Sequence, residues 1–201
     1  MAGAVASVTD FPLVVIFDLD FTFWPLDVDT DPVLPFSRRG GGGVRANEVI
    51  DAQGTLCALY PDVRRVLSEA VACGARVAFA SRTTDGAAAR AMLEAQGLWV
   101  LLRGEERLFQ AYPSGGSCKT VHFAKILDAL GMKPEDALFF DDMRDNIDAA
   151  VKGGTASVLL GSGGLTFTAW EKGLRDWGEM RSRSKAAEGK GRLGEKGQVA
   201  R

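Results

Sequence analysis

Two short apolar runs, each ending in aspartates, constrain this sequence most strongly. Residues 13–17 lead into Asp18 and Asp20, and the run within "DALFFDD" leads into Asp141 and Asp142. Apolar runs of this length are typical of strands that are buried on both faces of a sheet. A carboxylate is costly to bury unless a positive charge or hydrogen-bond donors surround it. The pattern therefore predicts buried strands whose ends carry a charged site.

Strand and helix patterns alternate along the rest of the chain. The predicted strands cover residues 13–18, 75–81, 99–102, 136–142 and 156–160, and the predicted helices cover residues 61–73, 84–96, 118–130, 144–153 and 165–177. This alternation is typical of an α/β fold, in which crossover helices cover both faces of a parallel sheet.

Residues 27–59 interrupt the alternation, because they show no sustained periodicity and include a run of glycines. A long irregular segment inside a compact domain is usually functional or disordered. We predict a mobile Gly-rich loop at residues 38–44, followed by a small β-hairpin made of residues 49–52 and 56–59. The hairpin is expected to form a flap over the sheet edge, and the insertion is too short for a large cap domain. Residues 1–180 are thus expected to form a single domain.

The charge of the chain is unevenly distributed. Residues 181–201 carry seven Lys or Arg and two Glu, a net +5, so the body carries −7 of a total of −2. Few large apolar residues and many glycines and charges predict a disordered basic tail. The acidic body argues against a nucleic-acid partner. No apolar run approaches the ~20 residues that span a bilayer, so no membrane partner is expected.

The three cysteines and the N-terminus indicate the cellular compartment in which we expect the protein. The cysteines are widely spaced, which fits neither a disulfide framework nor a zinc site. The N-terminus lacks the basic region of a secretory signal. We therefore expect a cytoplasmic protein, and a monomer by default.

Polar side chains follow several predicted strands, and the carboxyl ends of parallel strands meet at one edge. Asp18, Asp20, Asp142 and Asp141 are therefore expected to converge there. Repulsion among them favours a bound cation, and an all-oxygen ligand set favours Mg²⁺.

The same edge is expected to bind an anion. Ser81 ends a predicted strand, and Arg82 follows it just before a helix, so a hydroxyl and backbone N–H groups form a seat for phosphate. Lys119 lies at the start of a helix that faces the edge, and we favour it over Lys125 for balancing the charge. One aspartate of the first pair could attack phosphorus while the other protonates the leaving oxygen.

The segments "DLDFTFWPLDVDT", "LYPDV", "FASRT", "YPSGGSCKTVHF" and "FFDDMRDNI", within residues 13–160, resemble the magnesium-dependent phosphatase-1 family of the haloacid dehalogenase (HAD) superfamily. The resemblance implies a Rossmann-like three-layer α/β/α fold without a large cap. It also implies Mg²⁺, an aspartyl-phosphate intermediate and hydrolysis of phosphotyrosine or of sugar-phosphate (fructosamine) adducts of proteins.

The resemblance also assigns roles to residues. It makes Asp18 the nucleophile and Asp20 the general acid/base, whose backbone carbonyl ligates the metal. Asp142 becomes a direct metal ligand with Asp141 in support, and Asn146 holds a metal-bound water. The phosphate-binding set comprises Leu19, Thr22, Ser81, Arg82 and Lys119.

Other functions and roles stay open at this point. The scaffold also serves dehalogenases, which need no second aspartate, and phosphotransferases, which usually need a closing cap. A non-catalytic module that binds Mg²⁺ or phosphoproteins is a further alternative. Trp24 could be core or could line the substrate entrance, and Asp27 and Asp29 could select the substrate or be surface acids. His122 is expected to be structural or solvent-facing.

Overall fold

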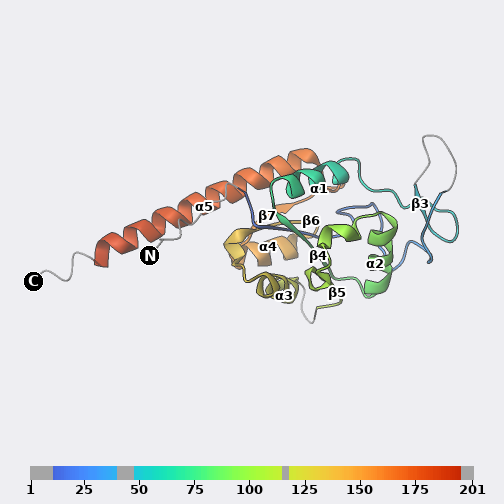
Figure 1. The fold of residues 1–201 in the computed structure, drawn as a ribbon, viewed down its shortest axis with the longest axis horizontal. Coiled ribbons are helices and arrows are strands. Elements are labelled where there is room, and N and C mark those ends of the chain that lie inside the picture. The colour runs from blue at the N-terminus through green and yellow to red at the C-terminus, as the bar shows by residue number, and fades with distance from the viewer. Residues whose placement is uncertain (1–10, 40–47, 115–117, 196–201) are drawn as a thin grey trace, which may run out of the picture.

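The computed structural model describes residues 11–39, 48–114 and 118–195, with side chains described up to residue 184. Its centre is a sheet of five parallel strands (Figure 1) in the order β5-β4-β1-β6-β7. The strands are β1 (Val14–Phe17), β4 (Arg76–Ser81), β5 (Phe109–Ala111), β6 (Ala137–Asp141) and β7 (Ala156–Leu159).

Helices cover both faces of this sheet. Helices α1 (Val63–Ala72) and α5 (Phe167–Glu195) pack together on one face, and α3 (Thr120–Leu130) and α4 (Arg144–Lys152) pack together on the other (Figure 1). Helix α2 (Gly86–Ala95) packs against the 3-10 helix η1 (Trp99–Leu102). Two further 3-10 turns are η2 (Glu106–Leu108) and η3 (Pro134–Asp136). The predicted three-layer α/β/α fold is confirmed.

The strand β1 lies at the centre of the core, and all four of its residues are buried. Phe17 lies opposite Phe79 of β4 and Phe140 of β6, and the rings of Phe17 and Phe140 stack with centroids 5.5 Å apart. Burying each such side chain stabilises the fold by about 1.5–3 kcal/mol. On the helical side, a Cβ at Gly173 would lie 2.8 Å from Cζ of Phe140, so only glycine lets α5 lie this close to β6. This packing fixes the strand ends that carry the aspartates.

Two short elements differ from the expectation. Residues 99–102 form η1 rather than a strand, because an apolar run of four residues fits a buried helical turn as well as a strand. The sheet contains one strand that the sequence does not predict. This strand is β5, which pairs with β4. It has only three residues, all half-buried at the sheet edge, so it carries no strong strand signal.

The flap contains a small antiparallel sheet, as expected, but its strands differ from the predicted ones. Here β2 (Ser37–Arg38) pairs with β3 (Val49–Ile50), and a single bridge joins Ile50 to Leu56. The carboxylate of Asp51 accepts the N–H groups of Val33, Gln53 and Thr55 and so organises the turn that follows β3. Residues 40–47, which include most of the predicted Gly-rich loop at residues 38–44, lie outside the described residues. The described part of residues 27–59 contains no separately folded cap.

The predicted disorder of the tail is wrong for residues 181–195, because α5 continues to Glu195. Alanine, arginine, lysine and glutamate are strong helix formers, and Arg181 also pairs with Asp136 at 3.2 Å. Figure 1 shows this end of α5 extending away from the sheet. Residues 196–201 lie outside the described residues. Within the described ranges, no helix has both the length and the apolar character needed to cross a bilayer.

Candidate active site

The carboxyl ends of β1, β4 and β6 open into one pocket of about 240 Å³. Its lining consists of Asp18, Asp20, Phe21, Asp27, Asp29, Ser81, Arg82, Thr83, Lys119, Asp142, Met143 and Asn146. Most of the residues predicted for the site therefore come together. Leu19 and Thr22 are fully buried outside this lining, and Asp141 lies behind it, in contact with Lys119.

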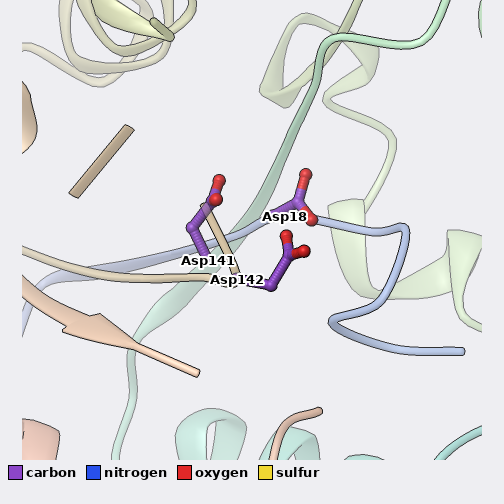
Figure 2. A group of neighbouring side chains, drawn as sticks. All are labelled: Asp18, Asp141 and Asp142. Carbon is purple, nitrogen blue, oxygen red and sulfur yellow. The ribbon is translucent and has the colours of Figure 1, made fainter. Parts of the chain in front are cut away.

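Three carboxylates converge at the pocket floor. Figure 2 shows the side chains of Asp18, Asp141 and Asp142 gathered at the ends of β1 and β6. One oxygen from each lies within 4.8 Å of the other two. Asp141 is fully buried and Asp18 nearly so, so water screens their repulsion poorly.

Lys119 supplies the opposing charge. It is the N-cap residue of α3, and its ammonium group donates to Asp141 Oδ2 at 2.6 Å and also to Asp18 Oδ1. Only 1% of this lysine is exposed. The alternative, Lys125, is exposed and lies over the ring of Tyr112, 4.5 Å from its centroid. The structure thus places Lys119, and not Lys125, at the aspartates.

The surroundings shift the pKa values of Asp18 and Asp142 upward. Burial raises the pKa of Asp18 to about 8, with Lys119 opposing the shift and Asp141 adding to it. Burial, and next the charge of Asp141, also raise the pKa of Asp142. One lysine therefore does not fully offset three carboxylates, and a further cation would be favourable here.

The donor chemistry of the pocket fits a hard divalent cation. Its acidic groups offer carboxylate oxygens, which such ions prefer. Asn146 donates through Nδ2 to both oxygens of Asp141 at 3.0 Å. Its own Oδ1 is buried and has no hydrogen-bond partner among the described residues. A buried acceptor that lines the pocket requires a donor, such as a water molecule held by an ion.

Asp20 is held apart from the three-carboxylate cluster. Its Oδ1 accepts a hydrogen bond of 2.7 Å from the indole N–H of Trp24, and that indole is fully buried. Trp24 is therefore part of the core and orients Asp20, rather than lining the pocket. Burial raises the pKa of Asp20 to about 6, although the hydrogen bond from Trp24 lowers it. A carboxyl group with a pKa near neutrality is suited to giving and taking a proton.

Asp29, whose role the sequence left open, organises the predicted phosphate-binding loop that follows β4. Ser81 Oγ accepts the N–H of Thr83 at 3.2 Å. Asp29, from the segment of residues 27–59, accepts the hydroxyl of Thr83 and the N–H groups of Thr84 at 2.9 Å and Asp85 at 3.0 Å. The loop after β4 is thus bound to the start of that segment. These partners lie 54–56 residues from Asp29, so no local pattern indicated them.

We expect Asp29→Asn to lower the free energy of unfolding at pH 7 by about 1 kcal/mol, a value reduced for water screening at this exposed position. Burial acts to raise the pKa of Asp29, but the hydrogen bonds from Thr83, Thr84 and Asp85 outweigh it and lower that pKa. The stabilisation is therefore present above the usual pKa of an aspartate and is lost as the pH falls through the lowered value.

Urea denaturation at pH 7 and at about pH 3 measures this difference. The matched control is Asp148→Asn, an exposed aspartate on α4. Equal stability of Asp29→Asn and wild type at pH 7 would contradict the prediction.

Two other features do not belong to the site. His122 is buried, stacks on Tyr112 and contacts the Tyr112 carbonyl oxygen at 2.9 Å, which confirms a structural place for it. A larger pocket of about 640 Å³ lies between the flap and the ends of α1 and α2, and none of the site aspartates lines it. Its arginines, Arg38 and Arg64, donate to the carbonyls of Ala95 and Gln96 at the end of α2.

A parallel α/β sheet with paired aspartates, a hydroxyl and a buried lysine at its carboxyl edge fits a phosphatase of the HAD superfamily, and the similarities of the sequence show this class. Residues 10–180 match the acid phosphatase family, and the chain belongs to that family. It is 31% identical to human magnesium-dependent phosphatase 1 over 171 residues, which cover 85% of this chain and 90% of the human protein.

Two further proteins are similar to this chain, one over a shorter stretch of sequence and one at lower sequence identity. A HAD-like hydrolase superfamily protein of Schizosaccharomyces pombe is 31% identical over 140 residues, 68% of this chain and 79% of the yeast protein. The crystal structure of a HAD-superfamily hydrolase from Ehrlichia chaffeensis aligns with a TM-score of 0.49 at 14% identity, over 85% of this chain and 98% of that one. The family assignment rests on the family match and the human relative.

Proposed function

We propose that this phosphatase is a Mg²⁺-dependent phosphomonoester hydrolase that acts through an aspartyl phosphate on Asp18. The observation that carries the proposal is the convergence of Asp18, Asp141 and Asp142 around Lys119 at the floor of the pocket. In the proposed site, Asp18 and Asp142, the backbone carbonyl of Asp20 and, in support, Asp141 would hold Mg²⁺. When bound, the ion would neutralise charge on the phosphoryl oxygens.

The proposed reaction has two steps. A carboxylate oxygen of Asp18 bonds to phosphorus while the bond from phosphorus to the leaving oxygen breaks, and Asp20 gives that oxygen its proton. A water molecule then attacks phosphorus, Asp20 takes a proton from it, and free phosphate leaves Asp18. Lys119 stabilises the negative charge of the transferring group, and so do Ser81 and the backbone of Arg82. Leu19 and Thr22, which the sequence places in the same phosphate-binding set, lie buried outside the pocket lining.

The proposed substrates are proteins that carry phosphotyrosine or phosphorylated fructosamine groups. The support is the open pocket, because the described part of residues 27–59 forms only a small two-stranded sheet and no cap. The monomeric state and a cytoplasmic location stay predictions, and we expect no nucleic acid or membrane as a partner.

The test is hydrolysis of p-nitrophenyl phosphate and of a phosphotyrosyl peptide, each with Mg²⁺ and with EDTA. We expect both substrates to be hydrolysed with Mg²⁺ and neither with EDTA, because three carboxylates and one lysine leave the phosphoryl group facing uncompensated negative charge. Activity confined to small free metabolites would contradict the proposed substrates. Equal turnover in EDTA would contradict the role of the metal.

A further inference from the structure

The pocket has two apolar residues among its otherwise polar lining. These are Phe21, which follows Asp20, and Met143, which follows Asp142. Both side chains are exposed, at 44% for Phe21 and 46% for Met143. Neither belongs to the buried core formed by the described residues. What distinguishes them is their place in the pocket lining, because ligand pockets combine a few polar groups with apolar and aromatic side chains.

The backbone of Phe21 is in an unfavourable conformation. Its φ is +54°, in the left-handed region that glycine adopts readily and bulky residues avoid. Among the described residues its ring pairs with no other aromatic ring. Ring stacking therefore does not account for a phenyl group here, and residues held in such conformations cluster at active sites and ligand clamps.

A hydrogen bond holds the backbone of Met143 in place, whereas its side chain is exposed. Its N–H donates to Asp141 Oδ1 at 2.7 Å, so its position relative to the aspartates is set. It precedes α4 as the N-cap residue but caps the helix with no side-chain bond. A thioether is flexible and makes favourable contacts with aromatic rings. Met143 is thus suited to pack against a flat apolar group that enters beside Asp142.

We propose that Phe21 and Met143 form an apolar clip that binds the leaving group of the substrate and selects esters with an aromatic group on the bridging oxygen. This inference rests on the proposed function, because it takes the polar residues of the pocket to bind the phosphoryl group. A phosphoryl group seated on Asp18 directs its leaving group outward, and Phe21 and Met143 are the apolar surface that the lining offers to it.

The experiment measures dissociation constants by titration calorimetry in the presence of Mg²⁺. The probes are phenylphosphonate and methylphosphonate, which share the phosphoryl end and differ in the apolar group. We expect wild type to bind phenylphosphonate more tightly, because its ring contacts the clip. The ratio to compare is the dissociation constant of methylphosphonate divided by that of phenylphosphonate. F21G and M143A should each lower this ratio by about fivefold or more, since each removes apolar contact with the ring.

The variants keep the proposal falsifiable. Glycine accepts the backbone conformation of residue 21 without strain, so F21G is expected to fold. The control is V151A, which truncates an apolar residue that is 57% exposed on α4 and lies outside the pocket lining. A ratio that falls in F21G and M143A but not in V151A supports the clip. A ratio that is the same in all four proteins overturns it.

The readout separates this inference from the proposed function. If wild type hydrolyses p-nitrophenyl phosphate with Mg²⁺ but the binding ratio does not change, the clip is wrong and the phosphatase mechanism stands. If the ratio changes as expected but no Mg²⁺-dependent hydrolysis occurs, the clip is supported as a binding site and the proposed reaction is wrong.

Discussion

Asp18→Asn is expected to lower the rate of p-nitrophenyl phosphate hydrolysis by about a thousandfold or more, because an amide cannot attack phosphorus. The variant should remain folded. The substitution removes one of three crowded carboxylates and leaves Lys119 paired with Asp141. Steady-state rates with Mg²⁺, together with a thermal melt of each protein, make the measurement.

A second readout tests the nucleophile directly. Wild type quenched in acid during turnover should carry a covalent phosphate on Asp18, and the variant should carry none. The control is Asp148→Asn, on the exposed face of α4, which should retain wild-type turnover. Full turnover by Asp18→Asn would contradict the assignment of the nucleophile. It would favour a different reaction route or a module that binds phosphate without this chemistry.

Lys119→Met is expected to lower the free energy of unfolding by about 3–5 kcal/mol in EDTA, because it leaves buried carboxylates without their partner. Methionine has nearly the same length as lysine, so the packing around it changes little. In wild type the lysine, 1% exposed, contacts both Asp18 and Asp141. The variant should also lose turnover, since no ammonium group faces the transferring phosphoryl group.

Urea denaturation of the variant with EDTA and with Mg²⁺ measures this effect. Mg²⁺ should restore part of the lost stability, because a cation that binds only the folded state shifts the equilibrium toward it. The matched control is Lys125→Met, on the same helix but exposed over Tyr112, with an expected loss of about 1 kcal/mol or less. A loss in Lys119→Met no larger than that of Lys125→Met would show that the buried charges are balanced in another way.

The sheet and most of the candidate site could be predicted from the sequence, because both depend on strong patterns. Uninterrupted apolar runs marked β1, β4 and β6. The rule that ligands bind at the carboxyl ends of parallel strands then placed Asp18, Ser81 and Asp142 together. Lys119 followed from its position at the start of a helix that faces this edge. These inferences needed only local periodicity and the direction of the strands.

The remaining features depend on contacts between distant residues. Asp29 binds a loop more than 50 residues away along the sequence, and β3 pairs with β2 as well as with Leu56 of the local hairpin that the sequence predicts. Phe21 is likewise invisible as a pattern, because its exposure and positive φ are properties of the folded chain. The short apolar segment η1 was misassigned because four residues cannot separate a strand from a helical turn.

The internal pairing of Lys119 with two aspartates has a consequence for the protein in a living cell. Since the chain carries its own counter-charge, its acidic floor can assemble before any ion arrives. Proteins whose folding depends on a metal lose their folded population when that metal is scarce. In this chain, a fall in free magnesium is expected to stop turnover without unfolding the protein. Turnover is then expected to resume when the ion binds again. Magnesium supply would then set how active each molecule is, and not how many molecules survive.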